Sequence, residues 1–176
     1  MDIFAHFFWT YALFHKTKKP YLAAFFGILP DLLSFGLLFA INIFLGKGFF
    51  ARGPPNPADV PSFITQSYNY THSLIIFLTI LIIIYLITKK FYLFLLGWPL
   101  HILIDIPSHT DKLFPTPFLF PISNYAFNGV SWGNPLFIKI NYSLLLITYI
   151  FIFKKNITKL YKSIKKLINY GCFRQN

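Results

Sequence analysis

The chain has 176 residues, of which 56% are hydrophobic and only 12% are charged. Soluble domains carry about 25% charged residues, so this composition excludes an ordinary soluble globular protein and indicates an integral membrane protein. The net charge is +11, and the lysines gather in short clusters between apolar runs and in the C-terminal tail. Clusters of this kind follow membrane topology and lipid contact, which argues against nucleic acid as the main partner.

Apolar segments follow one another along the chain, namely 2–15, 20–46, 71–88, 91–106 and 136–153. Most of them approach or exceed the ~20 residues that a helix needs to cross a bilayer, although 91–106 is short. Segment 2–15 is shorter still, so it either spans with the help of its neighbours or lies partly embedded. Two Pro-rich connections, 46–63 and 107–135, lie between them. We therefore predict an all-α fold, a polytopic membrane bundle of about five embedded helices.

The last residues, 154–176, place apolar side chains at helical spacing opposite many lysines. This pattern predicts a C-terminal amphipathic helix that lies on anionic lipid headgroups. We accordingly divide the chain into a membrane-embedded helical domain, 1–153, and a basic cytoplasmic tail, 154–176.

The lysine clusters predict a topology. They follow the first segment, separate the third from the fourth, and fill the tail. If these three places are cytoplasmic, every segment crosses once and the positive-inside rule is obeyed. We expect a protein of the cytoplasmic (inner) membrane with its N-terminus outside, its C-terminus inside, and both Pro-rich connections outside.

Polar side chains interrupt the apolar segments at few places. Asp31 follows Pro30, and an unpaired carboxylate near the bilayer centre costs ~2.5–3.5 kcal/mol. His101 and Asp105 are four residues apart, so they share one helix face and can bind one metal ion together. A hydrogen bond between His101 and Asp105 would also satisfy this pair without a metal. Asp31 could likewise be a neutral residue at a helix kink, hydrogen-bonded to a neighbour and not bound to a metal.

Topology places these groups at one depth. In the five-helix arrangement, six residues fall in the outer half of the bundle: His6, Asp31, His72, His101, Asp105 and His109. Random placement would scatter them, so a metal cluster is the economical interpretation, and imidazole with carboxylate suits zinc, with manganese or iron as alternatives. His15 abuts the cytoplasmic lysines and is expected to be structural. Ser108 and Asp111 are expected to cap a short following helix.

A resemblance rests on the order of these residues. His6, Pro30-Asp31, Thr71-His72-Ser73, His101-x-x-x-Asp105 and then "PTPFLFP" resembles the membrane-bound metal-dependent hydrolase family over most of residues 1–135. The order is also similar to that of the all-α zinc-dependent phospholipase C and P1-type nuclease superfamily. The likeness implies a main zinc site of Asp31, His72, His101 and Asp105, with Asp105 bridging toward a metal held by His6, and with His109 serving another. The chain has no Glu and no His after residue 109, so we expect one or two ions.

The sequence thus predicts a membrane-embedded metal-dependent hydrolase, a phosphoesterase or other esterase acting on a lipid-like substrate at the outer face. Asp105 or Asp31 would take a proton from water, and the outer cations Arg52 and Lys112 would meet a phosphate. Trp132 is expected at headgroup depth.

Two other functions remain open at this point. A metal or proton carrier would spread polar residues along the full depth of the membrane. A structural scaffold would use the His and Asp pairs to lock helices together and would bind no metal.

Overall fold

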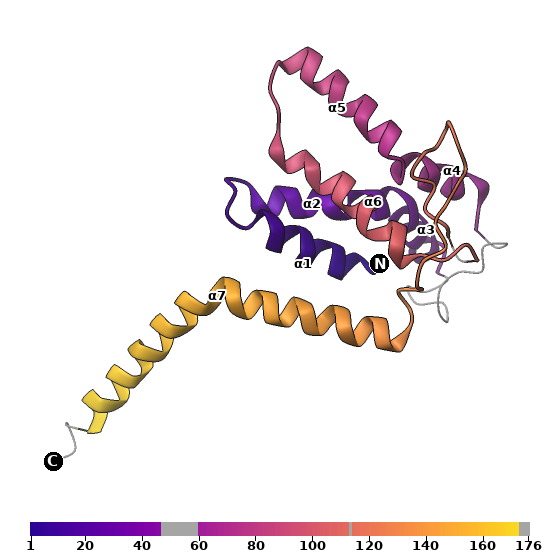
Figure 1. Cartoon of the computed structure of the whole chain (residues 1–176). Helices are drawn as coiled ribbons and strands as arrows, with labels where there is room; N and C mark the ends of the chain where they lie inside the picture. Colours follow the sequence, from indigo (N-terminus) through magenta and orange to yellow (C-terminus); the bar gives the residue numbers. More distant parts are fainter. Residues whose placement is uncertain (47–59, 113, 173–176) are drawn as a thin grey trace.

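The computed structural model describes residues 1–46, 60–112 and 114–172, and its regular elements are all helices (Figure 1). The predicted all-α class is confirmed. The N-terminal half contains α1 (Ile3–Phe14), α2 (Pro20–Asp31), a π-helical turn (Leu32–Gly36), α3 (Leu37–Phe44), α4 (Ser62–Thr71) and α5 (Leu74–Thr88). A 3₁₀ turn (Leu93–Leu96), α6 (Gly97–Ser108) and α7 (Pro135–Cys172) follow.

Local signals in the sequence explain several helix ends. Asp2 caps α1 by accepting a hydrogen bond from the backbone N–H of Ala5 at 3.0 Å. Pro20 occupies the first turn of α2, where its missing N–H costs nothing. Ser73 caps α5 through its hydroxyl, which accepts from the N–H of Ile76.

Fewer helices meet the length and composition of a membrane span than the five segments that the sequence predicted. Pro20–Phe44 and Pro135–Lys154 are long and apolar enough to cross a membrane, and α4 with α5 adds a third candidate if this pair, bent by 63°, is one span. The remaining apolar helices, α1 and Leu93–Ser108, are shorter. Within the described residues, length and composition therefore identify two or three candidate spans. Embedding of all five predicted segments stays a prediction.

Helix α4 was not anticipated as a separate element. Its sequence, SFITQSYNYT, is rich in polar residues, so it carries no strong hydrophobic signal. It buries only one face, with Ile64, Tyr68 and Thr71 inward. The break between α4 and α5 falls at His72 and Ser73, and this break turns His72 into the bundle.

Small residues bring three helices close together. A Cβ atom on Gly27 of α2 would collide with the side chain of Thr10 on α1, and one on Gly97 of α6 would collide with the carbonyl oxygen of Ala23 on α2. Glycine at these positions lets the backbones approach. As a result α1, α2 and α6, which carry most of the predicted site, share one tightly packed interface.

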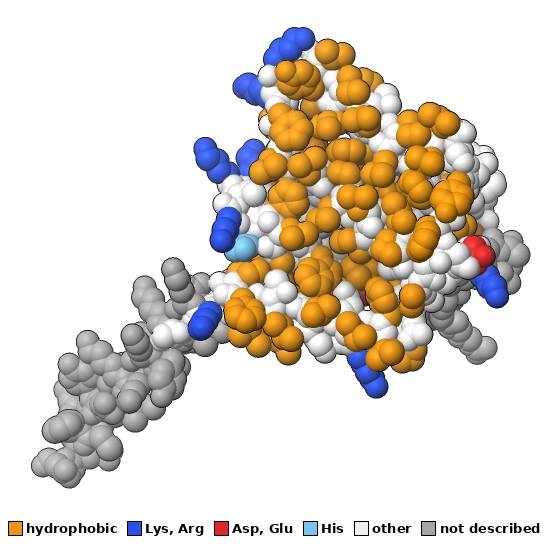
Figure 2. Space-filling model, in the orientation of Figure 1, with side chains coloured by type: hydrophobic (Ala, Val, Ile, Leu, Met, Phe, Trp, Pro, Cys, Tyr) orange, Lys and Arg blue, Asp and Glu red, His pale blue; other side chains and the backbone are white. Residues whose placement is uncertain are grey.

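The basic turns gather at one end of the molecule. The α1–α2 turn, the α5–α6 turn and the end of the α7 span lie on the same side (Figure 1), and lysines mark that side in the space-filling view (Figure 2). Hydrophobic side chains cover most of the face between this end and the opposite one (Figure 2). The N-terminus and the connection between α6 and α7 lie at the opposite end (Figure 1).

Helix α7 packs its first half against α1. Met1, Ala5 and Leu145 form a small core there, with Trp132 packed against it. Trp132 is therefore half-buried against the protein, and its position at headgroup depth stays a prediction. The predicted domain boundary at residue 153 falls inside α7, which continues to Cys172.

Candidate metal centre

Four polar residues from three separate helical regions meet inside the bundle. Each offers one ligand atom, and these atoms all lie within 4.8 Å of one another: Asp31, His72, His101 and Asp105. The side chains of His72, His101 and Asp105 are fully buried, whereas that of Asp31 keeps 17% exposure. These residues come from the Pro-Asp, Thr-His-Ser and HxxxD motifs, which the fold brings together.

The nitrogen and oxygen atoms of this group are closely spaced. The Nε2 atom of His101 lies 3.1 Å from Oδ2 of Asp105 and 3.7 Å from Oδ1 of Asp31. The Nε2 atom of His72 lies 3.5 Å from Oδ1 of Asp31 and 3.6 Å from Oδ2 of Asp105. The two Nε2 atoms are 3.1 Å apart. Two imidazoles and two carboxylates therefore surround one point.

Backbone carbonyls fix which nitrogen of each ring carries hydrogen. The Nδ1 atom of His101 lies 2.7 Å from the carbonyl oxygen of Gly27, and Nδ1 of His72 lies 3.1 Å from that of Tyr68. A carbonyl oxygen only accepts hydrogen bonds, so each Nδ1 donates, and in the neutral ring Nε2 keeps its lone pair. Both lone pairs point at the same place, as in histidines that ligate a metal.

The carboxylate of Asp105 divides its two oxygens between two surroundings. Oδ1 contacts the amino group of Met1 and lies 2.9 Å from Nε2 of His6. Oδ2 faces His72 and His101, yet it is buried and accepts no hydrogen bond from any group in the described part of the chain. A buried, ionised oxygen without a partner costs several kcal/mol. A cation bound between the four residues would satisfy this oxygen and both imidazole lone pairs, so the residues fit a metal ion.

The local backbone explains how Asp31 reaches the centre. Pro30 has no N–H to continue the helical ladder, and a wide π-helical turn, Leu32–Gly36, follows directly. Ser34 stabilises this turn by donating its hydroxyl to the carbonyl of Pro30 at 2.9 Å. Single π-helical turns are frequent at functional sites. Here the change of helix pitch falls at the residue that faces His72.

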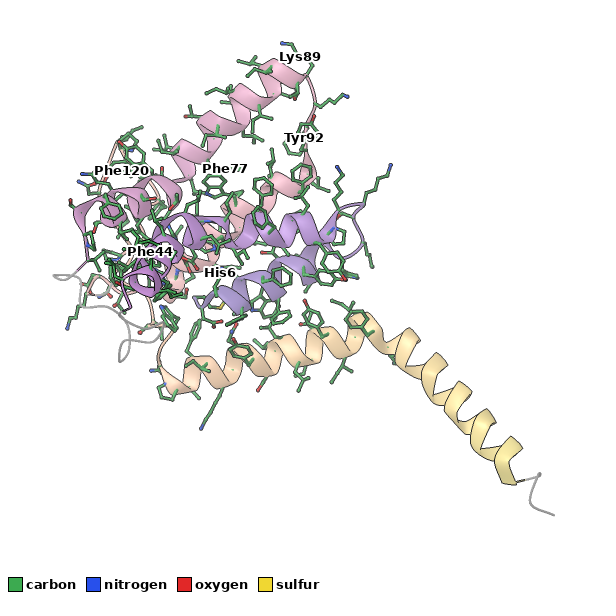
Figure 3. All side chains as sticks on the ribbon, turned by 180° about the vertical axis from the view of Figure 1, so that it is seen from behind. His6, Phe44, Phe77, Lys89, Tyr92 and Phe120 are labelled. Carbon is green, nitrogen blue, oxygen red and sulfur yellow. The ribbon has the colours of Figure 1, made fainter. Side chains whose placement is uncertain are left out.

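His6 and His109 lie beside this group, around the other oxygen of Asp105. Nε2 of His109 is 3.7 Å from Oδ1 of Asp105 and 3.2 Å from the amino nitrogen of Met1. The His6 ring stacks on His101 with 3.7 Å between centroids, and it lies among the helices in Figure 3. The six residues that the sequence singled out as ligands thus come together around one carboxylate: Asp105 belongs to the group of four, and His6 and His109 flank its other oxygen.

Tyr68, which sequence reasoning missed, holds two of the histidines. Its hydroxyl donates to the carbonyl of Phe114 at 3.0 Å, which leaves a lone pair for Nδ1–H of His109 at 3.1 Å. Thr116 adds a second oxygen 3.2 Å from the same nitrogen. The Tyr68 ring also stacks on His72, with centroids 3.9 Å apart. One signal was available, since Tyr68 precedes His72 by one helical turn and so shares its face.

Burial also sets the protonation state of His109. Its side chain is 9% exposed, and this burial lowers the pKa of His109 to about 4, against the opposing pull of the Asp105 charge. The ring is therefore neutral at pH 7. With Nδ1–H donated to Tyr68, its Nε2 lone pair is directed toward Asp105 and Met1.

The capping role expected for Asp111 is wrong. Its side chain is exposed, and its backbone N–H donates to Oδ1 of Asn128 at 3.2 Å. Between Asp111 and Pro135, leaving residue 113 aside, the described residues contain no helix that it could cap. The Pro-rich sequence that follows disfavours a helix there. Asp111 is a polar residue of an exposed turn.

The other sequence candidates lie away from the centre. Nδ1 of His15 contacts the carbonyl of Ala12 at 2.6 Å at the end of α1, in keeping with its expected structural role. Lys112 is exposed in the connection after His109. Arg52 lies outside the described residues.

Known proteins add no further evidence about this site. No family model, curated protein or solved structure matches the chain. The likeness to membrane-bound metal-dependent hydrolases therefore rests on the motifs, and the candidate site rests on their geometry.

Proposed function

We propose that the chain is a membrane-embedded, metal-dependent hydrolase. One observation carries this proposal: two histidines with Nδ1–H committed to backbone carbonyls point their Nε2 lone pairs at two carboxylates in a buried site. With both rings neutral, the side chains of the group of four, as far as the chain is described, bring acceptor atoms together there. A mixed nitrogen and oxygen set of four ligands suits zinc, and the flanking pair, His6 and His109, would support a second ion on Oδ1 of Asp105.

The two carboxylates would divide the chemical work. A bound divalent ion supplies a water molecule whose pKa is lowered to about 7 and polarises the oxygen of an ester. Asp31 retains 17% exposure of its side chain, so incoming water would reach it more readily than Asp105, and we assign it the role of proton acceptor. Asp105 is fully buried, and its Oδ2 would hold the ion among the group of four, while its Oδ1 faces His6 and His109.

A scaffold that only locks helices together accounts less well for the same geometry. In such a protein each buried polar atom should find its partner within the protein. Instead Oδ2 of Asp105 and Nδ1 of His6 are buried without a hydrogen-bond partner among the described residues. In their neutral rings, the Nε2 atoms of His72 and His101 would also face each other, 3.1 Å apart, with no hydrogen to share between them.

The order of the sequence motifs supports a proposal for the substrate class. The order of the Pro-Asp, Thr-His-Ser and HxxxD motifs favours the hydrolase family named above, and its distant zinc phospholipase C likeness favours a phosphoester. We infer a lipid-like substrate, cleaved at the outer face, with Lys112 and Arg52 as cations for the phosphate. The lysine-rich tail, 154–176, would bind anionic headgroups on the cytoplasmic side.

A hydrolysis assay tests this function. Purified protein would be offered phospholipids, isoprenoid phosphates and nucleotides, with and without a chelator. We expect activity that rises with pH through a pKa near 7 and disappears with the chelator. Asp105→Asn keeps the shape but loses the charge, and should lose at least ~10²-fold in rate.

Asp111→Asn is the matched control, because Asp111 is exposed and lies outside the centre. It should retain nearly the full rate. Wild-type turnover by Asp105→Asn on any substrate that the protein cleaves would remove the catalytic role of the HxxxD pair.

A further inference from the structure

The connection between α6 and α7 exposes large apolar side chains to an unusual extent. No charged residue occurs between Lys112 and Lys139. Along this stretch the exposed fractions are 37% for Leu119, 80% for Ile122, 59% for Tyr125, 47% for Phe127 and 54% for Val130. A water-exposed loop of this length would normally carry charge, and contiguous exposed apolar surface marks a binding surface.

Hydrogen bonds fasten this connection at its first end to the region of His72. The N–H of Leu74 donates to the carbonyl of Phe118 at 3.0 Å, and the hydroxyl of Ser73 donates to that of Phe120. Ser73 and Leu74 follow His72 directly in the sequence. The connection is therefore anchored beside one histidine of the centre.

The second end is anchored to the end of α6. The N–H groups of Gly129 and Val130 donate to the carbonyls of His109 and Pro107 at 2.8 and 2.9 Å. A Cβ atom on Gly129 would collide with the Pro107 carbonyl, so the close approach of the two backbones needs glycine. Hydrogen bonds thus hold residues 118–130 at both ends, and these bonds keep the exposed apolar side chains on the outside of the protein.

The position of the connection identifies what covers it. Along the chain, the connection leads into the start of α7, where Leu136 is 65% and Ile140 is 52% exposed within a candidate membrane span. Phe120 lies at the opposite end of the molecule from Lys89 (Figure 3). An uncharged, partly aromatic segment that leads into a membrane span matches the interface of a bilayer.

We propose that residues 118–130 form a lipid-embedded lip, inserted into the membrane leaflet next to the centre. Ile122 and Tyr125 lie at its most exposed part and contact lipid directly. If the proposed hydrolase function also holds, on which this consequence rests, the substrate enters from the leaflet and its cleaved bond lies at headgroup depth. The lip itself requires no bound metal and no activity.

Fluorescence of single labels tests the lip. In a Cys172→Ser background, a cysteine replaces Ile122 or Tyr125 and receives an environment-sensitive fluorophore, and the full chain is placed in phosphatidylcholine vesicles. Ile147, which is 49% exposed in the α7 span, serves as the lipid-facing control. Asp111, exposed in the same connection, serves as the water-facing control. Quenching is measured with nitroxide-labelled phosphatidylcholine and with iodide.

We expect the labels at Ile122 and Tyr125 to emit at shorter wavelength than that at Asp111, to be quenched by the nitroxide lipid, and to be protected from iodide. Labels that iodide quenches as it does at Asp111 would overturn the proposal. Labels protected from both quenchers would also overturn it, because protein, such as a second copy of the chain, would then cover the surface. All these readings are independent of whether the protein cleaves any substrate.

Discussion

Each imidazole of the four-residue centre is oriented by a backbone group on another turn or helix. Gly27 of α2 accepts from His101 of α6, and Tyr68 accepts from His72 one turn later. Because these acceptors are carbonyl oxygens, they select one tautomer and aim Nε2 at the carboxylates. The chemistry of the centre therefore depends on backbone positions as much as on the ligand side chains.

Removing the hydroxyl of Tyr68 tests this dependence at a single atom. In Tyr68→Phe the ring and the carbonyl that hold His72 remain, while His109 keeps only Thr116 on its Nδ1 atom. Partners of this kind are worth about 10–100-fold in metal affinity or activity. We expect about a 10-fold loss of hydrolytic rate, with metal still bound by the four-residue centre.

Tyr70→Phe is the control, because Tyr70 lies on the same helix but is 52% exposed. It should leave the rate unchanged. Equal rates for Tyr68→Phe and the wild type would show that the hydroxyl does not orient His109 for the reaction. Loss of all bound metal from Tyr68→Phe would show instead that the hydroxyl supports the whole centre.

Most residues of the candidate site could be predicted from the sequence. Spacing of four placed His101 and Asp105 on one helix face, and apolar surroundings made Asp31 conspicuous. Tyr68 carried no such mark, since one more tyrosine in a chain that is 21% aromatic looks like core. Its role follows from contacts with Phe114 and His109, which are distant in sequence.

At the scale of the elements, α2 combines two features that serve the centre. In its middle, Gly27 has no side chain, which lets α1 approach closely. At its end, the helix is irregular from Pro30 through the π-helical turn. The carbonyl of Gly27 orients His101, and the irregular end of the helix turns Asp31 toward His72. Both depend on the same helix holding its position against α1 and α6.

Filling the contact between α1 and α2 should disturb this helix. The new methyl group in Gly27→Ala would overlap with Thr10. Overpacking of this kind costs about 1–3 kcal/mol, so we expect a lower unfolding temperature in detergent. Because the Gly27 carbonyl orients His101, metal binding should weaken as well.

Gly133→Ala provides the comparison, since a Cβ there meets nothing nearer than 3.6 Å. It should leave both properties close to those of the wild type. An unfolding temperature of Gly27→Ala equal to that of the wild type would contradict the close approach of α1 and α2.

The elements themselves were predicted unevenly from the sequence. Long apolar runs indicated where the helices of the bundle lie, because hydrophobicity over about 20 residues is a strong signal. The polar helix α4 and its 63° bend from α5 were missed. Their basis is tertiary, as α4 buries Ile64 and Tyr68 against neighbours that local sequence does not reveal.

At the scale of the whole molecule, the lysine clusters and the connection beside the candidate metal centre lie toward different ends. The lysines of the α1–α2 and α5–α6 turns mark one end (Figures 1 and 2), whereas the anchored connection beside His72 and His109 lies toward the other. This separation matches the positive-inside pattern along the sequence. It supports, as a proposal, an orientation with the lysine-rich end in the cytoplasm.

Labelling of single cysteines in intact cells tests the orientation. In a Cys172→Ser background, a cysteine at Ser62, exposed at the start of α4, should react with a membrane-impermeant thiol reagent. A cysteine at Thr88, exposed beside Lys89, should react only after the cells are opened. The reverse pattern would place the lysine-rich end outside and would remove the proposed outer-face substrate.

Metal content of the purified protein tests the central claim most directly. Protein isolated in detergent without chelator should contain one to two divalent ions per chain, and His101→Ala should lose the ion of the four-residue centre because it removes one of the converging Nε2 atoms. His15→Ala should keep the wild-type content, because His15 bonds to the carbonyl of Ala12 at the end of α1 and lies outside the group of four. Wild-type protein that is folded, purified under conditions that spare weak sites, and yet free of metal would contradict the account.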